Sequence, residues 1–231
     1  MRHTPAASPP CPEDPVMPTD DAAPVDLPPL NGEPLALEFL NTVFPLRGAL
    51  RDGLNTPGKL AWWLRSCRPK FTTPLQDAVL DRIDPADVRC FVTLRDTARR
   101  LVEAYVNRQR PDPVDVAQLN RVASAGQQWP CLVWEAGGPP TAHELRTAPP
   151  VTAAQIEIAH AVIALLGGNT AIDPRRCTAP GCVFFFDHAR FRRSWCSTGC
   201  GNRARAARHY ARHHPGRDTA PCSNDPRPAP R

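Results

Sequence analysis

The chain has 231 residues, a net charge of +5 and a hydrophobic content of 42%, values that suit a globular protein with one full domain and a smaller module. Its apolar runs fall far short of the roughly 20 residues that span a bilayer, so we expect a cytoplasmic protein without membrane contact. The nine cysteines are an odd number, and four of them fall within residues 177–200. This distribution argues against a secreted disulfide scaffold and favours reduced thiols with one local metal cluster.

Charge is unevenly distributed along the chain. Residues 175–217 contain ten arginines and one acidic residue, Asp187, which gives this segment a charge of +9 and leaves the rest of the chain at −4. Such asymmetry is typical of a basic module that meets a polyanion and is attached to a mildly acidic body.

Both ends of the chain are rich in proline and poor in large apolar side chains, and the first segment also carries several acidic groups. Such segments cannot bury enough apolar surface to fold. We therefore predict a disordered acidic tail over residues 1–33 and a second disordered tail over residues 215–231.

Residues 34–172 show mainly helical patterns. The spacing of apolar residues predicts a short helix over residues 34–44 and a longer one over residues 152–166. Three further helices are expected where Thr-Pro or Asp-Pro supplies an N-cap followed by a first-turn proline. They are predicted to start at Pro57, Pro85 and Pro113. Residues 129–146 change to a pattern with a Gly-Gly-Pro-Pro break, which predicts one short β-hairpin in this otherwise α-helical domain.

Four cysteines follow in two closely spaced pairs. They are Cys177, Cys182, Cys196 and Cys200. Structural zinc takes four tetrahedral thiolates, and two short-spaced pairs separated by a loop supply that geometry. Ser197 is expected to cap a terminal helix running to residue 214, which places Cys200 in the first turn, where the helix dipole favours a thiolate.

The loop between the two cysteine pairs is predicted to hold two extended arms, over residues 183–186 and 191–195, folded back on each other. The result would be a small treble-clef-like finger over residues 173–214 with one structural zinc ion. A redox pair prefers C-x-x-C beside a βαβ unit, and a disulfide is uncommon in a cytoplasmic protein, so both alternatives are weaker.

The predicted terminal helix is basic on one side of a helical wheel, and its alanines on the other side are expected to lie against the zinc core. The basic side comprises Asn202, Arg205, Arg208, His209 and Arg212, and Arg190, Arg192 and Arg193 add charge just before the helix. Arginine suits phosphate because its planar fork donates two parallel hydrogen bonds. We predict that these residues contact nucleic acid; the alternative is an ordinary solvated basic face.

Arg203 falls away from the basic side of this helix. A buried-side arginine needs a partner, and Asp187 is the only acidic residue in the module. We therefore predict an internal ion pair between Asp187 and Arg203.

With these residues, WCSTGCGNR at 195–203 resembles the signature of the CGNR zinc fingers, bacterial proteins named for the Cys-Gly-Asn-Arg run that is 200–203 here. FFFDHARFRRSWC at 184–196 is similar to the same family. LALEFLNTV at 35–43 and TPGKLAWWL at 56–64 resemble the α-helical ABATE domain that usually precedes this finger. The resemblance implies a stress-linked transcription regulator that binds DNA through the finger, without established enzymatic activity.

Four polar residues close to the first helix, Asn41, Thr42, Arg47 and Asp52, are candidates for a small-ligand pocket, although capping and loop hydrogen bonds are the commoner use of such residues. No G-x-S-x-G, P-loop or dinucleotide pattern is present, so we expect no enzyme. The prediction is a DNA-binding transcription regulator whose helical domain senses a small-molecule effector or forms a homodimer. The alternative is a zinc adaptor that binds RNA or protein without operator specificity.

Overall fold

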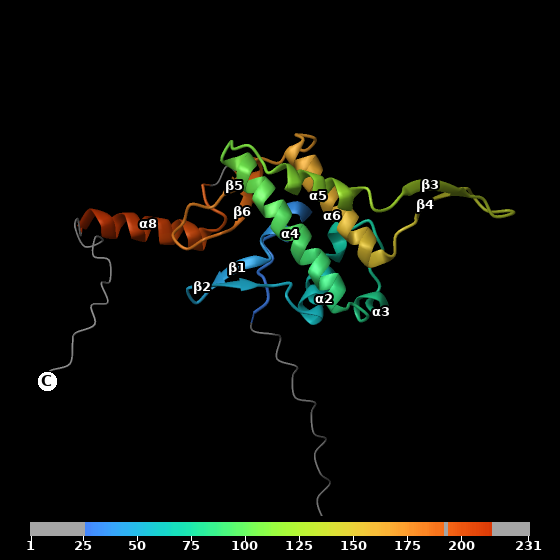
Figure 1. Ribbon diagram of the computed structural model, residues 1–231, viewed down its shortest axis with the longest axis horizontal. Helices are drawn as coiled ribbons and strands as arrows, with labels where there is room; N and C mark the ends of the chain where they lie inside the picture. The colour runs from blue at the N-terminus through green and yellow to red at the C-terminus, as the bar shows by residue number, and fades with distance from the viewer. Residues whose placement is uncertain (1–25, 192–193, 214–231) are drawn as a thin grey trace, which may run out of the picture.

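The computed structural model describes residues 26–191 and 194–213 (Figure 1). The predicted tails therefore lie outside the described residues, except for residues 26–33. Within residues 26–33, Pro28 and Glu33 are buried, so this part of the predicted tail is ordered, which corrects the prediction. In the described part, no helix combines the length and apolar character needed to cross a membrane.

A helical body forms the larger part of the molecule. Its helices are α1 (Leu35–Leu40), α2 (Pro57–Ser66), α3 (Asp77–Leu80), α4 (Pro85–Val106), α5 (Pro113–Ala123) and α6 (Pro150–Leu166), with the 3-10 turn η1 (Arg68–Lys70) after α2. The long helix α4 packs against α1, α5 and α6 (Figure 1). The core of the helical body contains the aromatic side chains of Phe39, Trp63 and Phe91, with Phe39 in ring contact with each of the other two.

The predicted starts of three helices are confirmed. Thr56 accepts a hydrogen bond from the backbone of Lys59 at the start of α2, and Asp84 forms a capping box with Asp87 at the start of α4. Asp112 caps α5 through the backbone of Val114. In each case the following proline occupies a position whose N–H has no helical partner.

The first helix is shorter than predicted, and a hairpin follows it. Helix α1 ends at Leu40, and β1 (Val43–Leu46) pairs with β2 (Ala49–Asp52). The turn consists of Arg47 and Gly48, with φ of 50° and 81°. Two consecutive positive φ values are what a two-residue hairpin turn needs, so residues 43–52 form a hairpin where apolar spacing alone suggested that the helix continues to Phe44.

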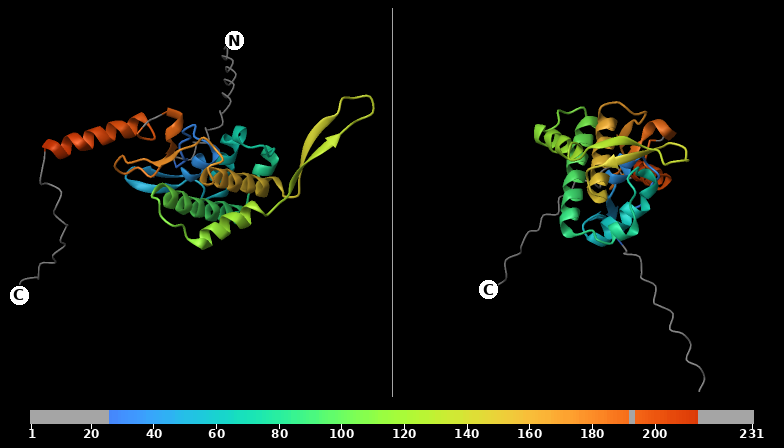
Figure 2. Two further views of the ribbon diagram at one scale, coloured as in Figure 1. Left: turned by 90° about the horizontal axis from the view of Figure 1, so that it is seen from above. Right: turned by 90° about the vertical axis from the view of Figure 1, so that its right-hand side faces the viewer.

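The predicted hairpin before α6 is confirmed as β3 (Gln128–Val133) and β4 (Thr141–Arg146). It projects from the helical body at the end opposite α8 (Thr198–His213), as Figures 1 and 2 show. Trp129 and Trp134 are exposed on it.

The finger comprises β5 (Pro174–Arg176), β6 (Phe185–Asp187), the short α7 (His188–Phe191) and α8. In the described part of the chain, the first predicted arm pairs with residues before the first cysteine and not with the second arm, which corrects the sequence prediction. Instead β6 pairs with β5, and residues 188–191 are helical. The first cysteine pair therefore lies in the loop of this hairpin. The fold is mainly α with a small four-cysteine finger, as predicted.

Finger and helical body share hydrogen bonds and core residues. Asn41 at the end of α1 donates to the carbonyl of Phe185 at 2.8 Å and accepts from its N–H at 2.9 Å. The Phe185 ring belongs to the core of the helical body. In addition, the backbone N–H of Asp187 donates to the Glu33 carboxylate at 3.0 Å. The finger is thus packed onto the helical body, although the sequence suggested two separate units.

Candidate metal centre and nucleic-acid interface

The structure brings the four predicted zinc ligands together. Their Sγ atoms lie within 4.8 Å of one another and all four residues are buried. The Cys182–Cys196 and Cys196–Cys200 sulfur pairs are 3.7 and 3.3 Å apart. Thiolates about 2.3 Å from zinc at the corners of a tetrahedron are separated by about 3.8 Å, so the cluster fits one zinc ion.

Local backbone features position each half of the cluster. The N–H of Cys177 donates to Phe184 at 2.8 Å, and that of Cys182 donates to Ala179 at 3.0 Å, which closes the knuckle. Gly181 has a φ of 71°, a conformation that glycine adopts without strain. In the second half, Ser197 Oγ accepts from the N–H of Cys200 at 3.2 Å, as the predicted cap requires.

The sulfur atoms lie close enough to shift the pKa values of Cys177, Cys182 and Cys196, in opposite directions. Hydrogen bonds from the Cys182 and Cys196 thiols lower the pKa of Cys177 to about 2, while the interaction with Cys177 raises the pKa of Cys182 to about 11. The pKa of Cys196 is raised because it donates to its neighbours. A bound zinc ion would stabilise all four groups as thiolates.

Each residue of the Cys-Gly-Asn-Arg run has a distinct structural role. A Cβ atom on Gly201 would lie 3.2 Å from Trp195 Cε3, so glycine leaves room for the indole ring. The side-chain oxygen of Asn202 accepts from the guanidinium of Arg205. Arg203 Nη2 donates to Cys200 Sγ at 3.0 Å. The run therefore supplies a ligand, space for an aromatic ring, and two polar contacts at the start of α8.

The predicted ion pair between Asp187 and Arg203 is not formed. Asp187 accepts from the backbone N–H groups of Asp173 and Ala189 at 3.0 and 2.9 Å. Arg203 is exposed and lies three residues beyond Cys200 on one helix, a spacing that brings the two side chains together. Its partner is therefore the sulfur of the metal site.

The predicted basic side of α8 is exposed. It comprises Asn202, Arg205, Arg208, His209 and Arg212. The guanidinium carbons of Arg205 and Arg208 lie 5.9 and 5.6 Å from the centre of the Trp195 ring, within range of a cation–π interaction. Of the three other predicted contact residues, Arg192 and Arg193 lie outside the described residues, and Arg190 belongs to α7.

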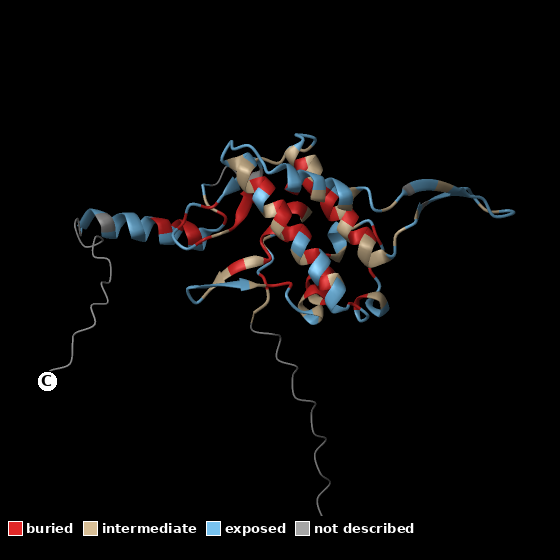
Figure 3. Ribbon diagram, viewed as in Figure 1, coloured by how far each residue is buried: buried red, intermediate tan, exposed pale blue. Residues whose placement is uncertain are grey.

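The other side of α8 differs from the prediction, because it does not cover the zinc core along its length. Ala204 is buried beside the cysteines, but Ala207 and Tyr210 are exposed. Figure 3 shows the buried residues of α8 confined to its first turns. After about two turns, α8 therefore projects beyond the packed core of the finger.

Three of the four residues proposed for a ligand pocket have structural partners instead, and the fourth lies in an exposed turn. Asn41 holds Phe185, and Thr42 donates to the carbonyl of Phe39 at 2.7 Å. Asp52 receives two hydrogen bonds from Arg95; burial opposes ionisation, yet Arg95 keeps the pKa of Asp52 below its ordinary value. Arg47 occupies the exposed β1–β2 turn. The commoner use of such residues, in loop and capping hydrogen bonds, is the one observed.

Sequence reasoning missed the residues that join finger and body. Arg99 on α4 donates to the carbonyls of Leu40 and Val183, and Glu103 forms an ion pair with Arg176. Glu33 joins the same contact region. No local pattern marks these residues, because each partner lies far away along the chain.

Comparison with protein families agrees with this architecture. The family model named ABATE, described as "Putative stress-induced transcription regulator", matches residues 33–169, more than half of the chain. The chain belongs to the ABATE family. The CGNR zinc finger model matches residues 174–213, so the ABATE domain and the finger meet near the predicted junction. No curated protein matches the chain.

In this ABATE protein, the family match and the sulfur geometry lead to the same description of the finger. The CGNR match includes all four cysteines, and the structure places their sulfur atoms around one centre. The finger is able to hold one zinc ion, and this ion would be structural because four thiolates leave no open position.

Proposed function

We propose that this protein is a transcription regulator that binds double-stranded DNA by placing α8 in the major groove. The observation that carries the proposal is the projection of α8 from the finger, with Arg205 to Tyr210 exposed on all sides (Figure 3). A helical segment whose side chains are exposed on every side does not pack on its own protein. It is therefore suited to contact an external partner.

The dimensions of the projecting segment fit DNA. An α-helix with its side chains is about 10–12 Å across, and the exposed part of α8 runs from Arg205 to His213. The major groove of B-DNA is about 12 Å wide and 8.5 Å deep and admits an α-helix. The deep and narrow major groove of A-form RNA does not, so this geometry favours DNA over duplex RNA.

The charge of α8 supports the same partner. Helix α8 carries four arginines and no acidic residue. Arg205, Arg208 and Arg212 follow one side of the helix, with two of them over Trp195. If about four or five basic groups reach phosphates, log affinity should fall with log salt at a slope of roughly −4 to −5.

We propose that the ABATE domain senses an effector or forms a homodimer, and that the protein has no catalytic role. Support for regulation through this domain comes from its contacts with the finger. On α4, Glu103 pairs with Arg176 just before the first cysteine pair, and Arg99 donates to the carbonyl of Val183 just after it. A shift of α4 on effector binding or dimerisation would therefore move the residues that hold the first cysteine pair.

Selection from random DNA duplexes by the zinc-loaded full chain at moderate salt tests the function. An enriched motif supports the regulator, because specific binding requires discrimination above the salt-dependent background. The double variant Arg208→Ala/Arg212→Ala should lose binding, while Arg89→Ala, an exposed arginine on α4, should retain it. Equal retention of all duplexes, or a preference for RNA, would overturn the proposal in favour of the zinc adaptor.

A further inference from the structure

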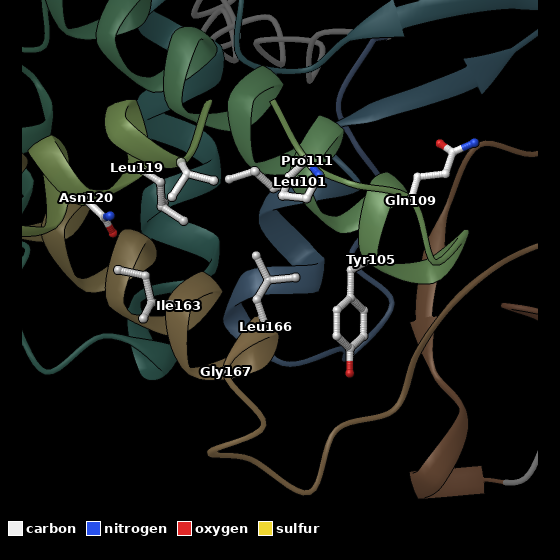
Figure 4. A pocket seen from close by; sticks show the side chains of 10 residues that line it. Leu101, Tyr105, Gln109, Pro111, Leu119, Asn120, Ile163, Leu166 and Gly167 are labelled. Atoms are coloured by element: carbon white, nitrogen blue, oxygen red, sulfur yellow. The ribbon is translucent and has the colours of Figure 1, made fainter. Parts of the chain in front are cut away.

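A cavity lies where the C-terminal ends of α4 and α6 meet α5, away from the zinc site. Its volume is about 390 Å³. The lining consists of Leu101, Tyr105, Gln109, Pro111, Val116, Leu119, Asn120, Ile163, Leu166 and Gly167. Figure 4 shows Leu119, Ile163 and Leu166 between Asn120 on one side and Tyr105 on the other. The volume is in the range of about 300–1,000 Å³ that is usual for small-molecule sites.

The chemistry of the lining restricts what the cavity can bind. Leu101 and Leu119 are buried at 4% exposure each, so the cavity is walled by the apolar core of the body. Among the described residues, no charged side chain lines it. An ion or a nucleotide would lose its hydration there without a compensating charge. The ligand class is therefore neutral and mainly apolar.

Polar groups lie at opposite margins of the cavity, with Asn120 on one side and Tyr105 on the other. The hydroxyl of Tyr105 and the amides of Asn120 and Gln109 are the side-chain hydrogen-bonding groups of the lining. A few placed polar groups in an apolar site fix the orientation of a bound molecule. An apolar ligand with a neutral hydroxyl, carbonyl or amide group at its periphery matches this arrangement.

The same turns of α4 contact both the cavity and the finger. Leu101 and Tyr105 line the cavity, while Arg99 and Glu103 on the same turns bond to Val183 and Arg176 of the finger. The end of α6 forms another wall, and the chain continues from there directly into β5. A molecule that fills the cavity would therefore constrain two connections to the zinc module.

We propose that this cavity binds a neutral, mainly apolar small molecule that forms hydrogen bonds at its periphery, and that this molecule is the effector of the regulator. The effector role rests on the proposed DNA-binding function, whereas the binding site itself does not. A concave site of this size suits a small molecule better than a second copy of the chain, because a stable protein interface buries about 800 Å² on each partner.

The neutral fluorescent probe N-phenyl-1-naphthylamine, titrated into the zinc-loaded full chain, tests the binding site. We expect saturable binding of one probe per chain. Val116→Trp places an indole at the cavity mouth and should weaken binding at least tenfold, since Val116 lines the cavity. Val114→Trp is the matched control, because Val114 lies on the same helix, is 72% exposed and does not line the cavity; its probe affinity should stay within twofold.

Three results would overturn the site. They are probe binding that does not saturate, equal probe affinity in the two tryptophan variants, and a wild-type chain that binds no probe while Val116→Trp changes the oligomeric state seen by sedimentation. The last result would make the cavity a protein interface. If Val116→Trp does not fold, Tyr105→Ala takes its place, because it removes an exposed wall of the cavity and should weaken the probe several-fold.

The effector role is tested by measuring probe affinity with and without a saturating amount of the selected duplex. Linkage requires that the probe and the duplex change each other's affinity by the same factor. A difference of threefold or more supports the effector role, and equal affinities overturn it. Probe binding without any selected duplex would overturn the DNA-binding function alone, and a selected duplex without probe binding would overturn the cavity alone.

Discussion

Phe39, Trp63 and Phe91 pack against one another inside the helical body, whereas the interior of the finger consists of four cysteines and a few apolar side chains. The two regions also exchange aromatic residues. Phe185 from the finger lies in the core of the body, and Phe44 from the body lies in the core of the finger. A large domain can be stabilised by apolar burial alone, but a module of about 40 residues needs further support, and here it has both a metal site and the neighbouring domain.

The largest expected effect is that of zinc removal, which should affect the two regions unequally. Structural zinc contributes about 10–16 kcal/mol in comparable modules, so a strong chelator should unfold the finger and let trypsin cleave faster at its arginines. The helical body should retain most of its far-ultraviolet circular dichroism. If trypsin cuts the finger no faster in chelator, then packing against the body stabilises the finger without metal.

The next effect concerns the junction. Asn41→Ala leaves the N–H and carbonyl of Phe185 without their partner, and each unsatisfied buried group costs about 1–3 kcal/mol. We expect a loss of about 2–4 kcal/mol in urea unfolding of the full chain. Asn55→Ala, which removes an exposed asparagine, should change stability by less than about 0.5 kcal/mol. Equal losses in the two variants would show that the junction contributes little.

A smaller effect is expected from Arg203→Ala, which removes the hydrogen bond to Cys200 Sγ. Groups that hydrogen-bond to metal ligands typically change metal affinity by about 10–100-fold, and we expect about tenfold weaker zinc binding in competition with a chromogenic chelator. Arg205→Ala, whose guanidinium bonds to Asn202 and not to sulfur, is the control. Unchanged zinc affinity together with lost DNA binding would make Arg203 a DNA contact.

The smallest expected effect is a change with pH in the stability that the Asp52–Arg95 ion pair gives to the helical body. In the folded protein the pKa of the Asp52 carboxyl is held below its ordinary value. The ionised carboxylate therefore stabilises the fold fully above the unfolded pKa of about 3.9. This stabilisation is lost as the pH falls through the lower pKa of the folded state. The difference in unfolding free energy between wild type and Asp52→Asn should therefore shrink from pH 6 to pH 3. Glu135→Gln, on the exposed hairpin, should show no such change; a constant difference for Asp52→Asn would contradict the ion pair with Arg95.

Features with a local cause were predictable from the sequence. The proline-capped helices begin where Thr-Pro and Asp-Pro occur, because capping involves only neighbouring backbone groups. The cysteine spacing likewise identified the zinc ligands and the cap at Ser197. The β3–β4 hairpin followed from its turn-forming residues.

Predictions that needed a distant partner were wrong. Asp187 is the only acidic residue in the finger, but its carboxylate accepts from backbone N–H groups, and Arg203 bonds to a sulfur on its own helix. Likewise, in the described part of the chain the first predicted arm of the finger does not pair with the second, because β6 pairs with a strand that precedes the first cysteine. A helical wheel also could not show that α8 leaves the core after Ala204, since this depends on the length of the finger.

The sequence by itself determined the mainly helical body, the four ligands and the basic terminal helix, because helix caps, metal-ligand spacing and charge are properties of neighbouring residues. Only the tertiary structure decided how the two regions are joined. Asn41 and Phe185 are 144 positions apart, and the cavity combines residues from three helices. Contacts of this kind depend on long-range packing, which no short stretch of the chain encodes.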